Sequence, residues 1–330
     1  MKYYPVYIPT LNRFEHFKQC VESLACNTHA DQTELVIGLD YPPSDKYVEG
    51  YEKIKAYIPL IQGFKKVTVF EWDENLGQSE NCRRILRYLF DHYDAAISTE
   101  DDLVFSPCFL DFMNKALNIY KDDPQVATVC GYIGENYYGQ FDKHLIFNFD
   151  NCGWGMGIWK HKEQNRWKKR NDDINMIFKS IKCSVKVLSV SPGIFSMFLA
   201  MIRLGQRWGD VLCSAQNIIN NLYQLCPTIS LVRNNGYDGT GVHCGDSDPL
   251  NLAQQKISDE LLFNYDMKDV ISTSDPIVRK LLFLQGLPKG FFMRGKVILS
   301  IIIRYIILRL NFCFSRSSGI LLTDGPSSNE

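Results

Sequence analysis

The chain has 330 residues, of which 45% are hydrophobic and 22% charged, and its formal net charge is −1. These values are typical of a globular protein with a sizeable core, and they exclude a largely disordered chain. The balanced charge also argues against general nucleic-acid binding, which relies on an excess of basic residues. By length, the chain could form two domains or one large α/β domain.

The cysteines and the N-terminus indicate a cellular setting. Eleven cysteines occur singly, with no C-x-x-C pair, whereas structural zinc sites use such pairs. The first residues, MKYYPVYIPT, lack the basic segment followed by an apolar one that a secretory signal has. We therefore expect free thiols in a reducing, cytoplasmic environment.

Strand-like and helix-like segments alternate along the first hundred residues. Strands are predicted at residues 5–8, 34–39, 66–71 and from 95 onwards, and helices at 14–24, at 48–58 and from a cap at Ser79. This alternation predicts an α/β fold with a mostly parallel sheet and helices on both faces. Beyond residue 107 the periodicity changes, with helices near 109–120 and 211–222 and apolar runs at 125–133 and 185–201.

Polar residues follow the predicted strands. Thr10 and Arg13 come after the first, Asp40 after the second, and Asn75 after the third, with Asn81 inside the next helix. Open α/β sheets bind ligands at the carboxyl ends of their strands. The glycine-rich fingerprints of dinucleotide-binding and P-loop proteins are missing, so the pattern is that of a nucleotide-binding α/β unit without those loops.

Three consecutive acids, Glu100, Asp101 and Asp102, follow the fourth predicted strand, and apolar residues resume at once. Side chains alternate along a strand, so Glu100 and Asp102 would face one side and Asp101 the other. Carboxylates gathered in this way repel one another unless they share a cation, and oxygen ligands favour Mg²⁺ or Mn²⁺. The alternatives are a solvated acidic turn, or a helix N-terminus near residue 106 that favours nearby negative charge.

Three later stretches contain further candidates. Trp154 lies in a run of glycine and tryptophan, and its indole could stack on a sugar or simply belong to the core. Asp210 follows Trp208 and Gly209 ahead of a predicted helix, either as an N-cap or as a catalytic acid. The loop at 234–245, which contains His243, is too rich in glycine to pack a core and could close over a ligand as a lid.

Taken in order, these residues resemble GT-A glycosyltransferases, most closely the branch of N-acetylglucosaminyltransferase I. The stretch 75–81 is also similar to bacterial family 2 glycosyltransferases. The resemblance covers about residues 3–245, and the acids at 100–102 with their apolar flank are its most specific part. It implies a GT-A (Rossmann-like) fold.

The resemblance also implies roles for matching residues. Asp102 would hold Mn²⁺ or Mg²⁺ on the diphosphate of a nucleotide sugar, while Glu100 and Asp101 would contact the ribose and the sugar. Arg13 and Asp40 would contact the base. Asp210 would be the catalytic base, and His243 would approach the diphosphate or the metal. The full set of predicted substrate contacts is Thr10, Arg13, Asp40, Asn75, Asn81, Glu100, Asp101, Trp154 and His243. Asn81 stands where the relative has a histidine.

We therefore predict an inverting, metal-dependent glycosyltransferase for a UDP-sugar, with UDP-N-acetylglucosamine first and galactose or glucose behind it. One base and in-line displacement would give inversion. The acceptor would be a glycan or a lipid-linked acceptor in bacterial-type polysaccharide synthesis. Two alternatives are open. A nucleotidyltransferase would need a basic, glycine-rich loop after the first strand, and a non-catalytic glycan- or nucleotide-sugar-binding protein would bind without turnover.

The composition changes again near the C-terminus. The run VILSIIIRYIILRLNFCF is long enough to span a bilayer, but Arg304 and Arg309 interrupt it. We expect residues 286–314 to form an amphipathic helix on the inner, anionic face of the membrane, the alternative being a buried helix that caps the domain. The predicted organisation is a nucleotide-sugar-binding half at 1–150, an acceptor-binding and catalytic half at 151–285, this helix, and a disordered tail at 315–330.

Overall fold

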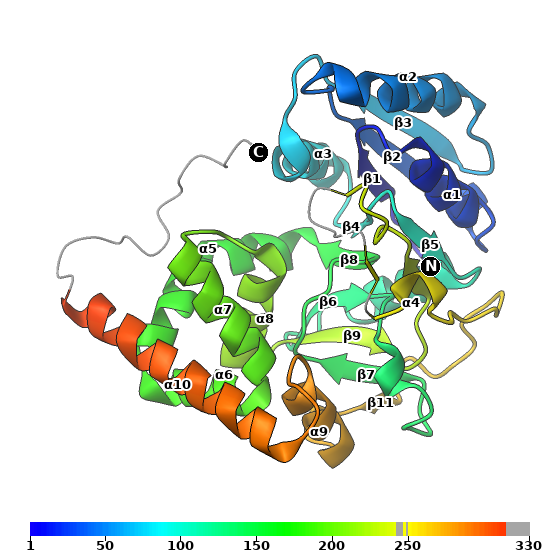
Figure 1. Ribbon diagram of the computed structural model, residues 1–330. Helices are drawn as coiled ribbons and strands as arrows, with labels where there is room; N and C mark the ends of the chain where they lie inside the picture. Colours follow the sequence, from blue (N-terminus) through cyan, green and yellow to red (C-terminus); the bar gives the residue numbers. More distant parts are fainter. Residues whose placement is uncertain (242–246, 249, 315–330) are drawn as a thin grey trace.

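The computed structural model describes residues 1–241, 247–248 and 250–314. Its strands are β1 (Val6–Thr10), β2 (Glu34–Leu39), β3 (Lys66–Glu71), β4 (Ala95–Ser98), β5 (Leu103–Phe105), β6 (Val126–Cys130), β7 (Leu145–Asn148), β8 (Met156–Trp159), β9 (Tyr223–Pro227), β10 (Val232–Asn234) and β11 (Val270–Ile271). Nine of them form one sheet in the order β11-β7-β9-β6-β8-β4-β1-β2-β3, and β10 pairs with β5 (Figure 1).

The large sheet is mostly parallel, as predicted. Its five parallel pairs are β1 with β2, β1 with β4, β2 with β3, β6 with β9 and β7 with β11. The three antiparallel pairs are β4 with β8, β6 with β8, and β7 with β9. Strands β1 and β2 are buried along their whole length, which explains why their sequences are continuous apolar runs.

Helices cover both faces of the first half of the sheet, which confirms the predicted α/β class. Helices α1 (Phe14–Ala25), α2 (Val48–Tyr57) and α4 (Phe109–Ile119) share a core with Val6 and Ile8 of β1. The intervening Tyr7 points the other way, towards α3 (Gly77–His92). Helix α3 begins two residues before Ser79, which therefore lies in its first turn and is not the cap that we predicted.

The second half carries a helical layer with its own core. It consists of α5 (Lys160–Lys179), α6 (Ile181–Val190), α7 (Pro192–Leu204), α8 (Gly209–Asn220), α9 (Pro276–Leu284) and α10 (Phe291–Phe314). The apolar run at 185–201 is divided between α6 and α7, because Pro192 starts a new helix and the Ser191 hydroxyl accepts a bond from the Ile194 amide at 3.3 Å.

Helix α10 lies along α7 at the outside of this layer (Figure 1). Among the helices that the structure describes, none combines the length and the apolar character needed to cross a bilayer. The tail predicted at 315–330 lies outside the described residues.

Candidate active site

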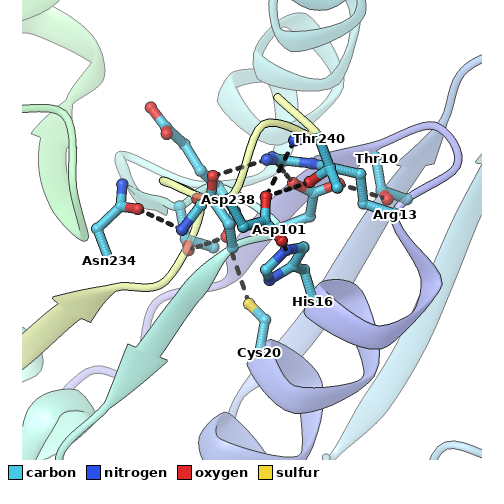
Figure 2. A network of polar contacts seen from close by, with 12 residues as sticks. Thr10, Arg13, His16, Cys20, Asp101, Asn234, Asp238 and Thr240 are labelled. Atoms are coloured by element: carbon cyan, nitrogen blue, oxygen red, sulfur yellow. Dashed lines mark hydrogen bonds and ion pairs between the residues drawn. The ribbon is translucent and has the colours of Figure 1, made fainter. Parts of the chain in front are cut away.

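The acids after β4 lie beside the polar residues that follow β1. The two strands are parallel neighbours, with Val6 opposite Ile97, so their carboxyl ends reach the same edge of the sheet. The Thr10 hydroxyl donates to Asp101 Oδ2 at 2.9 Å, and Arg13 makes an ion pair with Asp101 (Figure 2). Arg13 also makes an ion pair with Asp102 at 2.9 Å. The structure thus brings four of the predicted residues together, including Asp102, the predicted metal ligand.

Charge in this cluster is only partly balanced. Asp101 and Asp102 are 6% and 4% exposed. Burial raises the pKa of Asp101 although Arg13 counteracts it. Burial also acts to lower the pKa of Arg13, but the two aspartates outweigh it and raise that pKa, so Arg13 stays charged. Burial and the charges of Asp102, Asp210 and Asp101 raise the pKa of Glu100 to about 8. The single positive charge of Arg13 therefore compensates for three carboxyl groups.

The carboxylate oxygens that have no partner within the described ranges suit a divalent cation. Asp102 Oδ1 is buried and has no hydrogen-bond partner in the described part of the chain. No group of three or more histidine, cysteine, aspartate or glutamate residues that could hold a metal is found among the described residues. Mg²⁺ typically takes one or two protein carboxylates and completes its shell with water and substrate phosphates. Asp102 and Glu100 therefore suit a cation that arrives with a phosphate-bearing ligand.

The predicted lid, the loop at 234–245, contacts the same acids where it starts. Strand β10 pairs antiparallel with β5, and the Asn235 amide donates to the Asp102 carbonyl at 2.9 Å. A Cβ atom on Gly236 would lie 2.0 Å from Asp102 Oδ2, so only glycine fits there. Further on, Asp238 contacts His16 of α1 at 2.8 Å (Figure 2). His243, the predicted diphosphate contact, lies outside the described residues.

Asp210 lies in the first turn of α8, and the N-cap position before this turn is occupied by Trp208, so Asp210 is not the N-cap of the helix. A pocket of about 340 Å³ surrounds it, lined by Asp150, Ile194, Met197, Trp208, Gly209, Asp210, Val211 and Ser214. Its side chain is exposed to solvent at this pocket, although protein atoms surround the carboxylate closely enough to desolvate it in part. Partial desolvation and the charge of Asp150 raise the pKa of Asp210 to about 6.

Asp150 was not among the predicted residues. Its carboxylate accepts hydrogen bonds from Ser214 at 2.9 Å and from Gln285 at 2.7 Å. The sequence holds one hint, an acid four residues before Trp154, but nothing local connects it with a residue 60 positions further on. The pocket therefore depends on the packing of α7 and α8 against the loop after β7.

The residues after β2 shape the neighbouring loop. Asp40 is 4% exposed and accepts from the Tyr41 amide at 3.0 Å and the Leu76 amide at 2.8 Å. Burial raises its pKa despite these bonds. Asn75 donates to the Tyr41 carbonyl at 2.6 Å. Asp40 and Asn75 thus lie on the β2 side of the acids and fix the loop there.

Asn81 and Trp154 differ in what they leave accessible. Asn81 is 1% exposed, donates to the Gly38 carbonyl and accepts from the Trp72 indole, both at 2.9 Å. Its amide is therefore occupied within the protein, and we leave it out of the contacts proposed below. Trp154 is half-buried and packs edge-on against Tyr132, with ring centroids 4.6 Å apart. Part of its indole is free to meet a ligand.

Known proteins resemble parts of the chain. No protein-family model and no curated protein matches it. Among solved structures, the mannosyltransferase PcManGT from Pyrobaculum calidifontis, in complex with GDP-Man and Mn²⁺, is 19% identical, with a TM-score of 0.29 over 38% of this chain and 34% of that chain. TarS of S. aureus is 13% identical, with a TM-score of 0.34 over 52% and 30%. TarS 1-349 in complex with UDP-GlcNAc is 14% identical, with a TM-score of 0.31 over 39% and 34%. The match spans about a third of the length of each of these proteins.

Proposed function

We propose that this protein is a glycosyltransferase that moves a sugar from a nucleotide sugar to a glycan or lipid-linked acceptor. The observation that carries the proposal is the unpartnered, buried Asp102 Oδ1 beside the uncompensated Glu100, at the edge where β1 and β4 end. Such a pair favours a divalent cation, and the cation favours an anionic ligand such as a diphosphate. We take a UDP-sugar as the donor and UDP-N-acetylglucosamine as the first candidate.

The chain's own residues prepare the donor side. Thr10 and Arg13 hold Asp101 and Asp102 in one arrangement, so little reorganisation is needed when a ligand binds. Mn²⁺ or Mg²⁺, held by Asp102 with Glu100 beside it, would stabilise negative charge on the departing diphosphate. The loop that Asp40 and Asn75 hold in place would contact the nucleotide base. Trp154, whose side chain is only partly buried, is the residue that we propose to contact the sugar.

Asp210 supports the transfer step. Because its pKa is about 6, it is mostly ionised at neutral pH and can take the proton of an acceptor hydroxyl. Solvent exposure leaves it within reach of an acceptor, and Ile194, Met197 and Trp208 give its pocket apolar walls. A single base on the acceptor side predicts direct displacement with inversion at the anomeric carbon.

The nucleotidyltransferase alternative is less well supported. Such an enzyme needs cationic groups for a triphosphate after the first strand, whereas Arg13 is already engaged by Asp101 and Asp102. A non-catalytic binding protein would share the donor side and lack turnover. The accessible carboxylate of Asp210 favours catalysis over that alternative.

The test is release of nucleoside diphosphate from a panel of UDP-, GDP- and dTDP-sugars, with Mn²⁺ and with a chelator. We expect slow hydrolysis of one donor, even without acceptor, and its loss in chelator. Absence of metal-dependent binding and of hydrolysis for every donor, in protein shown to be folded, would contradict the proposal. Binding without hydrolysis, also after glycan and lipid-linked acceptors have been added, would favour the non-catalytic alternative.

A further inference from the structure

Helix α10 is fixed to the helical layer by one of its faces. Ile301 is fully buried, and Tyr305 packs on Phe195 with ring centroids 5.5 Å apart. The Tyr305 hydroxyl accepts from Ser184 at 2.6 Å and lies 3.3 Å from the Ile177 carbonyl, to which it can donate. These contacts with α5, α6 and α7 hold the helix at a set rotation, so its opposite face is also set.

The opposite face is apolar and exposed. Its residues recur every three or four positions and are Leu299 (58% exposed), Ile303 (50%), Ile306 (49%), Ile307 (54%) and Leu310 (50%), with Phe291 (86%) and Phe292 (83%) where the helix begins. We call this set the outer stripe. A helix that only capped the domain would turn polar residues outwards. A continuous exposed apolar stripe instead marks a surface that meets something else.

The charge around the outer stripe has one sign. Residues 276–311 include seven basic and no acidic residues, in a chain whose net charge is −1. On α10 these are Arg294, Lys296, Arg304 and Arg309. Within the described ranges none of the four forms an ion pair: Arg294 donates to the Pro288 carbonyl at 3.0 Å, Arg304 to the Ser300 hydroxyl at 3.0 Å, and Arg309 to the Tyr305 hydroxyl at 2.8 Å. These cations are therefore available to an anionic partner.

We propose that the outer stripe docks α10 on a membrane surface that contains anionic lipids. An interfacial helix of this kind buries apolar side chains at the headgroup boundary while its basic residues meet anionic headgroups. A lipid surface supplies both kinds of contact along the whole stripe. A second copy of this chain would bring two sets of unpaired cations together, which like-charge repulsion disfavours.

The docking helix is connected to the pocket of Asp210. Helix α7, on which α10 rests, contributes Ile194 and Met197 to that pocket. Gln285, in the link between α9 and α10, donates to Asp150 at 2.7 Å. Docking would therefore hold the pocket near the lipid headgroups, where a lipid-linked acceptor would present its sugar. This last step rests on the proposed function, whereas the docking itself does not.

The test is co-sedimentation of the full chain with phosphatidylcholine vesicles, with and without phosphatidylglycerol. We expect binding to the anionic vesicles that weakens as salt is raised. Lys296→Glu should weaken it at least about five-fold and Ile303→Asp at least about ten-fold, because each removes a contact with the lipid. Matched controls in the distant link between α2 and β3, Lys65→Glu and Leu60→Asp (Leu60 is 69% exposed), should bind like the wild type.

Three results would overturn the docking proposal. They are no binding to anionic vesicles, equal loss in the control variants, or a wild-type dimer in light scattering that Ile303→Asp dissociates. Donor hydrolysis without vesicles, measured alongside, keeps this proposal separate from the proposed function. It should be unchanged in Ile303→Asp, and vesicle binding should persist even if no donor is hydrolysed.

Discussion

The two groups of acids around the site differ in how their charge is balanced. Asp101 and Asp102 are buried and share an ion pair with Arg13, so their carboxylates are held in place and partly neutralised. We call these two acids the donor floor. Asp210 is open to solvent, and neither it nor Asp150 has an ion-pair partner in the part of the chain that the structure describes. A buried carboxylate that is held in place and partly neutralised suits ligand binding, whereas an accessible one without a cationic partner suits proton transfer. We propose that this difference, more than the number of acids, divides the two tasks.

The largest expected effect comes from Asp102→Asn. It removes the carboxylate that we assign to the cation, so metal-dependent donor turnover should fall at least about 10³-fold. Nucleoside diphosphate release under saturating Mn²⁺ measures this, and circular dichroism checks the fold. Asp122→Asn, at an exposed acid between α4 and β6 on the opposite edge of the sheet, should leave turnover unchanged. Turnover in Asp102→Asn near the wild-type level would remove the basis for a metal at this position.

Asp210→Asn should lower kcat about 10²- to 10³-fold, because a general base contributes in this range. The KM for the donor should stay within about two-fold, since Asp210 acts on the acceptor and not on the donor. Initial rates over a donor series, at fixed acceptor, separate the two constants. A raised donor KM with a normal kcat would instead place Asp210 on the donor side of the site.

The pH profile sharpens the assignment of the base. With a pKa of about 6, Asp210 is protonated and inactive as a base at lower pH, so kcat/KM should rise about ten-fold per pH unit up to that point and then level. Asp150→Asn removes a charge that helps to raise this pKa, so the rising limb should move to lower pH. An unmoved limb in Asp150→Asn would show that Asp150 does not act on the titrating group.

The smallest effect concerns stability without metal. The pKa of Glu100 is about 8 in the folded chain against an ordinary value of 4.5, so ionising it costs stability as pH rises between these values. In chelator, Glu100→Gln should therefore raise Tm by about a few degrees at pH 8 and change it little at pH 4.5. Thermal unfolding at both pH values measures this. A gain that is equal at both pH values would mean that it does not come from the charge of Glu100.

The fold of the first half, and the cluster around Asp102, could be predicted because their signals are local. Apolar runs predict β1 and β2, and the β-branched and aromatic residues of 66–71 predict β3. Because ligand-binding residues gather at the carboxyl ends of parallel strands, Thr10 and Arg13 are expected near the acids. Arg13 nevertheless lies on Asp101 and Asp102, whereas the family resemblance implied a contact with the base. Sequence spacing does not reveal with which of several polar neighbours a flexible arginine side chain forms its ion pairs.

The rest depends on contacts between distant residues. Strand β10 pairs with β5 across more than a hundred residues, and nothing in either short segment specifies that register. The sequence likewise does not specify that Asp150 bonds to Ser214 of α8 and to Gln285, which brings it close to Asp210. In α10 the apolar residues run almost all round, so the pattern could not show which side packs on α7 and which side is exposed.

The most direct test of separate roles for Asp102 and Asp210 is calorimetric titration of the donor's nucleoside diphosphate, with Mn²⁺, into three proteins: the wild type, Asp102→Asn and Asp210→Asn. We expect Asp210→Asn to bind like the wild type and both of these proteins to lose affinity in chelator. Asp102→Asn should bind weakly and show no response to metal. Equal, metal-dependent binding by Asp102→Asn, or lost binding by Asp210→Asn, would contradict the division of the site into a donor floor and an acceptor base.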